Sequence, residues 1–131
     1  MDEKTFNCRY VGEFEQLDMI GEGTYGVVFL GKDKETNETF AIKKMRVLDP
    51  NDGFPITSLR EIKILKALAR HPNIVNLRDV VVGKKRDSIF LVFEYCDIDM
   101  AKLIDQMHID KITFSESEIK CLTLQMVKGV F

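Results

Sequence analysis

The sequence lacks a long apolar run, a large charge imbalance and a cysteine framework. Its apolar runs are far shorter than the about 20 residues that a membrane-spanning helix needs. The formal net charge of −2 indicates no strong attraction to nucleic acid or to a membrane surface. The sequence has an odd number of cysteines, and these lie far apart with no metal-ligand spacing: Cys8, Cys96 and Cys121. We therefore expect free thiols in a reducing compartment, the nucleus or the cytoplasm.

Internal repeats, low-complexity tracts and a secretory signal are also missing. Residues 1–5 are largely charged, and no apolar segment follows them as a signal peptide would require. The length of 131 residues suits one small domain. A composition of 45% hydrophobic and 31% charged residues is ordinary for a soluble globular protein.

Hydrophobic periodicity predicts strands in the first part of the chain and helices toward its end. The predicted strands cover residues 14–20, 27–32, 38–45, 74–82 and 89–95. The predicted helices cover residues 57–70, 99–107 and 115–131. This order fits an α+β fold, in which one main helix packs on a five-stranded antiparallel sheet and two helices follow.

A glycine-rich turn separates the first two predicted strands. Gly21, Gly23, Gly26 and Val28 form the pattern G-x-G-x-x-G-x-V. Glycine lets a backbone approach phosphate oxygens closely, at dihedral angles that other residues resist. An ordinary hairpin turn is the alternative interpretation. A dinucleotide-binding βαβ unit does not fit, because a strand and not a helix follows the turn.

The third predicted strand contains a lysine that would need an anionic partner if it is buried. Lys43 lies among apolar residues, where a buried ammonium group is costly without an anion. Glu61, on the predicted helix, is a candidate partner through a charge-assisted hydrogen bond. Two alternatives exist: Lys43 could reach solvent at a sheet edge, and Ser58-x-x-Glu61 could be a helix-capping box. The order and spacing of the glycine turn, Lys43 and Glu61 together favour the ion pair.

Several segments together resemble the cyclin-dependent protein kinases. They are GEGTYGVV (21–28), AIKK (41–44), PITSLREI (55–62), HPNIV (71–75) and LVFEY (91–95). The resemblance is strongest to the PITSLRE group and its near relative, cyclin-dependent kinase ten, and it extends from about Phe14 to Phe131. It implies an N-terminal extension (1–13), an ATP-binding kinase N-lobe (14–96), and the hinge exit with the first helices of an incomplete C-lobe (97–131).

The resemblance assigns roles to individual residues. Lys43 contacts the α- and β-phosphates and pairs with Glu61, while Phe93 guards the back of the nucleotide pocket. Asp99 lies where the family contacts the ribose. The remaining residues implied in ATP binding are Ile20, Gly21, Glu22, Gly23, Thr24, Tyr25, Gly26, Val28 and Ala41 around the nucleotide, and Glu94 and Cys96 through their backbone. Without the family, Phe93 would be a core aromatic and Cys96 an inert buried thiol.

The resemblance also implies partners and regulation. The helix region 55–70 would contact a cyclin, and its position would decide whether the Lys43–Glu61 pair forms. Thr24 and Tyr25 match inhibitory phosphorylation sites, where added phosphate would repel the phosphates of ATP. Arg60 matches an arginine that gathers a phosphorylated activation-loop threonine, although a solvated charge is the simpler interpretation.

The 131 residues contain no H-R-D, D-F-G or A-P-E segment. In complete kinases these segments supply the catalytic aspartate and the Mg²⁺ ligands. We therefore expect weak ATP binding and no phosphoryl transfer by this chain alone, and we keep open a catalytically inactive short form that binds a cyclin or a nucleotide. An apolar stripe in the last helix should be exposed and promote self-association. Its residues are Ile119, Leu122, Met126, Val127 and Val130.

Overall fold

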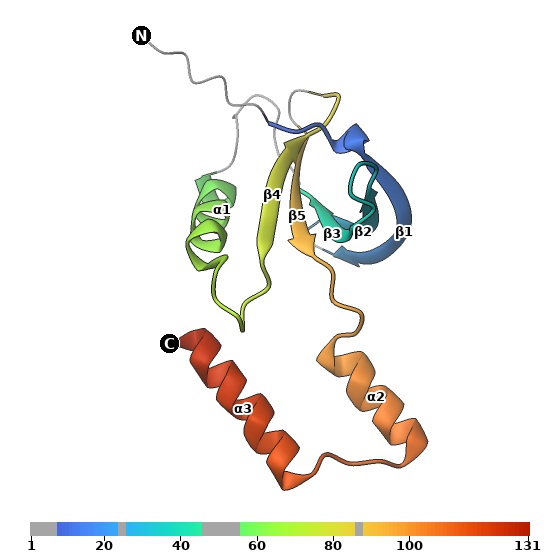
Figure 1. Ribbon diagram of the computed structural model, residues 1–131, viewed down its shortest axis with the longest axis vertical. Coiled ribbons are helices and arrows are strands. Elements are labelled where there is room, and N and C mark those ends of the chain that lie inside the picture. Colours follow the sequence, from blue (N-terminus) through green and yellow to red (C-terminus); the bar gives the residue numbers. More distant parts are fainter. Residues whose placement is uncertain (1–7, 24–25, 46–55, 86–87) are drawn as a thin grey trace.

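The computed structural model describes residues 8–23, 26–45, 56–85 and 88–131. A five-stranded antiparallel sheet with one helix beside it forms the upper part, and two further helices lie below (Figure 1). The elements are a 3-10 turn η1 (Val11–Glu13), strands β1 (Phe14–Gly23), β2 (Gly26–Asp33), β3 (Thr39–Lys44), β4 (Leu77–Val82) and β5 (Ile89–Glu94), and helices α1 (Ile56–Leu68), α2 (Met100–Asp110) and α3 (Glu116–Val130). The predicted fold class is confirmed.

The sheet has the strand order β1-β2-β3-β5-β4. The β1–β2 hairpin is longer than predicted, because the ladder continues through Gly21↔Val28 to Gly23↔Gly26. The expected turn over residues 21–26 is therefore wrong at residues 21–23 and at Gly26, which belong to the strands, and positions 24–25 lie outside the described residues. The β2–β3 connection turns at Asn37, whose φ of 60° is one that Asn tolerates better than most residues.

Two buried clusters lie on opposite faces of the sheet. Because side chains alternate along a strand, Ile42 and Val92 point to one face and Leu91 to the other. The first cluster contains Phe14, Phe29, Ile42, Val81, Phe90 and Val92. The second contains Met45, Leu77 and Leu91, and Ile62 and Leu65 of α1 pack against it. Helix α1 thus covers one face of the sheet beside β4.

Helix α1 and strand β4 are both shorter than their apolar patterns predicted. The helix ends at Leu68, whose carbonyl accepts a hydrogen bond from His71 N at 2.9 Å. Ile74 N then bonds His71 O at 3.3 Å, so residues 71–74 turn and do not yet extend. Strand β4 consequently begins at Leu77 and not at residue 74.

The lower helices have well-defined ends. Asp99 caps α2 by accepting a hydrogen bond from Lys102 N at 2.8 Å, and Lys111 ends that helix in the left-handed conformation. Ser115 and Glu118 form a reciprocal capping box that starts α3. None of the helices in the described part of the chain is long and apolar enough to cross a membrane.

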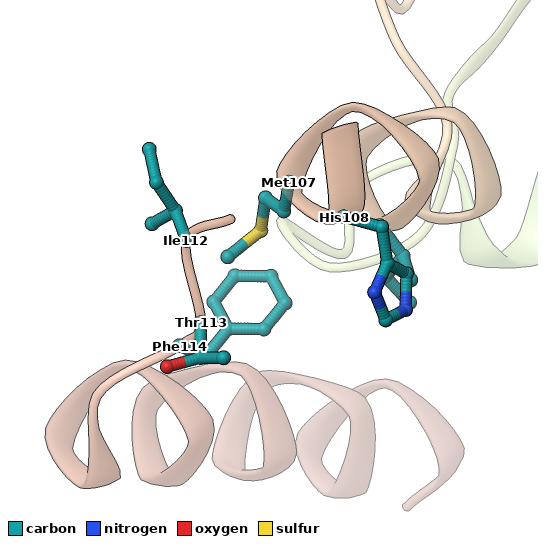
Figure 2. Close-up of a pocket in the computed structure, with 6 residues that line it drawn as sticks. Met107, His108, Ile112, Thr113 and Phe114 are labelled. Carbon is teal, nitrogen blue, oxygen red and sulfur yellow. The ribbon is translucent and has the colours of Figure 1, made fainter. Parts of the chain in front are cut away.

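Helix α3 runs back toward the upper part, so that its C-terminal end lies below α1 (Figure 1). Asn73 Nδ2 donates to Gln125 O at 2.9 Å and ties α3 to the segment between α1 and β4. A pocket of about 230 Å³ lies between α2 and the segment that leads to α3. Met107 and Phe114 face one another there (Figure 2). Four residues of the stripe predicted in the last helix are exposed, Ile119, Met126, Val127 and Val130, whereas Leu122 is partly buried. Met126 and Val130 are 61% and 86% exposed.

Candidate functional site

The sheet face that carries α1 gathers several predicted site residues. Val28 is paired with Lys43 across β2 and β3, and Ala41 is paired with Phe93 across β3 and β5. Paired residues share a face, and so do residues two apart along one strand. Val28, Ala41, Lys43 and Phe93 therefore lie on one face, and Phe93 also packs against the second buried cluster.

The structure brings Lys43 and Glu61 together. Lys43 Nζ lies 3.1 Å from Glu61 Oε1, and the two side chains are 15% and 42% exposed. The capping-box hypothesis for Ser58 and Glu61 is wrong, because α1 already begins at Ile56 and Ser58 lies buried inside it. The sheet-edge alternative for Lys43 is also wrong, since β3 lies inside the sheet and the neighbouring Lys44 is the exposed lysine. An ion pair thus links the central strand to α1.

The third glycine of the turn has a demanding conformation. Gly26 has φ of +125°, and a Cβ atom there would overlap the carbonyl oxygen of Lys44. Glycine is therefore required where β2 passes β3, one position after Lys43. Gly21 and Gly23 are half-buried and Glu22 is exposed. Thr24 and Tyr25 lie outside the described residues, and Arg60 is exposed on α1.

A pocket of about 370 Å³ opens beside the segment that joins β5 to α2. It brings together three predicted site residues, Ile20, Cys96 and Asp99. Sequence reasoning missed Tyr95 and Lys102, which line the same pocket. Their positions directly next to Cys96, and one helical turn after Asp99, are the signal that could have found them.

Glu94 and Asp99 both have structural partners at this segment. Glu94 binds Asn76 twice: its N–H donates to Asn76 O at 3.0 Å, and its Oε1 accepts from Asn76 N at 2.8 Å. Asp99 caps α2. The hypothesis of a buried thiol at Cys96 is wrong, because Cys96 is exposed and free, as are Cys8 and Cys121.

The family model described as Protein kinase domain matches residues 14–131. This chain belongs to the protein kinase domain family. Its kinase-domain sequence is 51% identical over 123 residues to the human protein named Cyclin-dependent kinase 10, a match that covers 94% of this chain and 33% of that protein. The Dictyostelium discoideum protein named Probable cyclin-dependent kinase 10 is 54% identical over 123 residues, covering 93% and 32%. The Drosophila melanogaster protein named Serine/threonine-protein kinase PITSLRE is 48% identical over 123 residues, covering 94% and 13%.

The resemblance to the PITSLRE group and its relative is confirmed by these matches. The kinase chain spans about a third or less of the length of these relatives. Among the residues that the structure describes, no three His, Cys, Asp or Glu side chains are grouped closely enough to hold a metal ion. The described part of this kinase domain therefore presents the Lys43–Glu61 pair, the glycines on either side of positions 24–25, and a pocket that contains three predicted site residues.

Proposed function

We propose that this chain is the ATP-binding part of a cyclin-dependent serine/threonine protein kinase, acting in the nucleus or the cytoplasm. The observation that carries the proposal is the Lys43–Glu61 ion pair on the sheet face that carries α1. In protein kinases a strand lysine of this kind holds the α- and β-phosphates, and a helix glutamate holds the lysine. A glycine turn between two strands then covers the phosphates.

The nucleotide is proposed to lie between the glycine turn and the segment after β5. Ile20, Val28 and Ala41 would contact the adenine ring, and Phe93 would close the back of the pocket. The backbone of Glu94 and Cys96 would bind the adenine edge, with Asp99 near the ribose. The shared face of the strand residues and the common pocket of Ile20, Cys96 and Asp99 support this arrangement.

The complete enzyme is proposed to transfer the γ-phosphate of ATP to serine or threonine in proteins. That reaction needs the H-R-D aspartate and Mg²⁺ held by an asparagine and the D-F-G aspartate. None of these segments occurs in the 131 residues, so we expect this chain alone to bind ATP weakly and to transfer no phosphate. Phosphorylation of Thr24 or Tyr25 would oppose ATP binding by charge repulsion.

Nucleotide binding by the whole chain tests the proposal directly. A fluorescent ATP analogue is titrated into the wild type, Lys43→Met and the matched control Lys44→Met. We expect Lys43→Met to weaken binding by about tenfold or more, because it removes a charge-assisted contact of about 1.5–3 kcal/mol. Lys44 is exposed and lies on the other face, so Lys44→Met should stay within about twofold. Equal affinities of the two variants would refute the site.

A second proposal is that the chain binds a cyclin without catalysing a reaction. Helix α1 supports it, because its apolar residues Ile56, Leu59 and Ile64 are 68%, 53% and 58% exposed. Arg60 is exposed on the same helix and is proposed to gather a phosphorylated residue in the complete enzyme. A pull-down of cyclins with the wild type, Leu59→Glu and the control Leu124→Glu on α3 tests this interaction. Retained binding by Leu59→Glu would exclude α1 as the cyclin contact.

A further inference from the structure

The segment just before the kinase domain is ordered across the top of the sheet. Residues 8–13, here called the strap, start beside β4 and end at β1, the strands at the two edges of the sheet. Val82 N donates to Arg9 O at 3.0 Å, and Tyr10 forms a parallel bridge with Val82. Gly12 lies against the ring of Tyr10, which a Cβ atom at position 12 would overlap. The strap therefore connects the two edges of the sheet (Figure 1).

Arg9 is the centre of the contacts between the strap and the hairpin. Its Nη2 lies 2.9 Å from Asp33 Oδ2 and its Nε lies 2.7 Å from Glu13 Oε2. The guanidinium also lies 5.0 Å from the ring centroid of Phe14, at a distance typical of cation–π contacts. The pKa of Arg9 is raised by its hydrogen bonds, first to Glu13 and then to Asp33.

Asp33, the last residue of β2, connects that strand to the strap. The carboxyl group is buried, which by itself would raise its pKa. Hydrogen bonds from Glu35 N at 2.8 Å and from Arg9 favour the ionised form and lower the pKa overall. Lys34 adds two contacts to the strap: its Nζ donates to Gly12 O at 2.8 Å and its N donates to Glu13 O at 3.0 Å.

Strand β1 lies at an edge of the sheet and has one neighbouring strand, β2. Phe14 is buried at its start, but residues 15–20 are all exposed. The ladder between β1 and β2 shifts register twice, between Gln16 and Met19 and between Met19 and Gly21. Such irregularities bend a strand and weaken its pairing. The strap thus adds contacts at the start of β1 to those of the β2 ladder, and the far end of β1 leads toward the glycine turn.

We propose that Arg9 is a positioning residue for nucleotide binding, because it fixes the start of β1 and, through the β1–β2 hairpin, the place of the glycine turn. The proposal rests on the proposed ATP-binding function. It assigns Arg9 no contact with the nucleotide. It predicts that loss of Arg9 loosens β1 more than the rest of the sheet and weakens nucleotide binding together with that loosening.

Hydrogen exchange and nucleotide titration of the whole chain test the proposal. The variants are Arg9→Gln, which keeps much of the side-chain length but removes the charge, and the matched control Arg70→Gln, at an exposed arginine beyond α1. We expect Arg9→Gln to speed exchange in residues 14–23 by about tenfold, to leave α3 unchanged, and to weaken binding of a fluorescent ATP analogue by about three- to tenfold. Arg70→Gln should change neither quantity by more than about twofold.

Each contrary result has a distinct meaning. Faster exchange in residues 14–23 with unchanged affinity would overturn the role of Arg9 in nucleotide binding and leave the ATP site standing. No detectable binding by the wild type would overturn the ATP site itself, and with it this role of Arg9. If Arg9→Gln exchanges fast throughout the sheet, Arg9→Lys is measured instead. An equally general effect in Arg9→Lys would make Arg9 a residue of overall stability and refute the proposal.

Discussion

Replacing Gly26 by alanine should destabilise the kinase sheet at the point where the glycine turn meets the strand of Lys43. Two independent features predict the effect. The φ of +125° at Gly26 is one that residues with a Cβ atom rarely adopt, and the added methyl group would overlap the backbone oxygen of Lys44. Backbone of a central strand cannot move aside as the end of a flexible side chain can.

The size of the effect follows from these two features. An unfavourable backbone conformation costs about 1–3 kcal/mol. Moving the Lys44 carbonyl away disturbs the Val27↔Lys44 pair, and weakening its hydrogen bonding costs about 1 kcal/mol of stability. The sum is about 2–4 kcal/mol, a large part of the about 5–15 kcal/mol that stabilises a typical domain. For a chain of this size the melting temperature should fall by about 8–15 °C.

Thermal unfolding followed by circular dichroism measures this change, with Gly129→Ala as the matched control. Gly129 lies in α3, and its nearest potential contact, Asn73 O, is 3.3 Å from an added Cβ atom. Alanine favours a helix over glycine by about 1 kcal/mol, so this control should change stability by no more than about that amount. A Gly26→Ala protein that melts within about 2 °C of the wild type would refute the reasoning.

Three further predictions concern other parts of the chain. Gly31→Ala should lower stability to denaturant by about 1–3 kcal/mol, because its Cβ atom would overlap Cδ1 of the fully buried Ile42, and adding Ile42→Val, which removes that atom, should recover part of the loss. Acid titration followed by fluorescence should show the free energy of unfolding falling once the pH drops below about 3.8, the ordinary pKa of the Asp33 carboxyl group. The folded state lowers the pKa of Asp33, so its ionised carboxylate stabilises the fold fully above that pH, and this contribution is lost as the pH falls through the lowered pKa. Met126→Lys combined with Val130→Lys should reduce self-association in sedimentation velocity, because both side chains belong to the exposed stripe of α3, and an unchanged association state would exclude that stripe.

The order of strands and helices could be predicted because each has a strong local pattern. The continuous β-rich apolar run of β5 and the helical period in α1 are visible within single segments. The ends of elements were less predictable, since they depend on distant partners. Strand β1 extends to Gly23 only because it pairs with Gly26 across the hairpin, and β4 starts late because His71 keeps the preceding residues in turns.

The candidate site was predictable where a motif has a fixed spacing. Lys43 and Glu61 were expected as partners, and the structure places their charged groups 3.1 Å apart. The strap was not predictable, because residues 1–13 show only weak patterning and Arg9 meets Asp33, 24 positions away, through the folded sheet. Lys102 in the pocket was missed for a similar reason: its place depends on how α2 leaves the sheet.

The strand order also sets a sequence of events during synthesis on the ribosome. Strand β3 needs β5 as a neighbour, yet residues 45–88 must be made first. Because the ribosome adds about 5–20 residues per second, the edge of β3 stays unpaired for several seconds in the nascent chain. That edge belongs to the strand with the fully buried Ile42, and an unpaired apolar edge readily joins a wrong strand. The nascent chain is then most open to chaperones and to misassembly, and the face that carries Lys43 is completed only when β5 emerges.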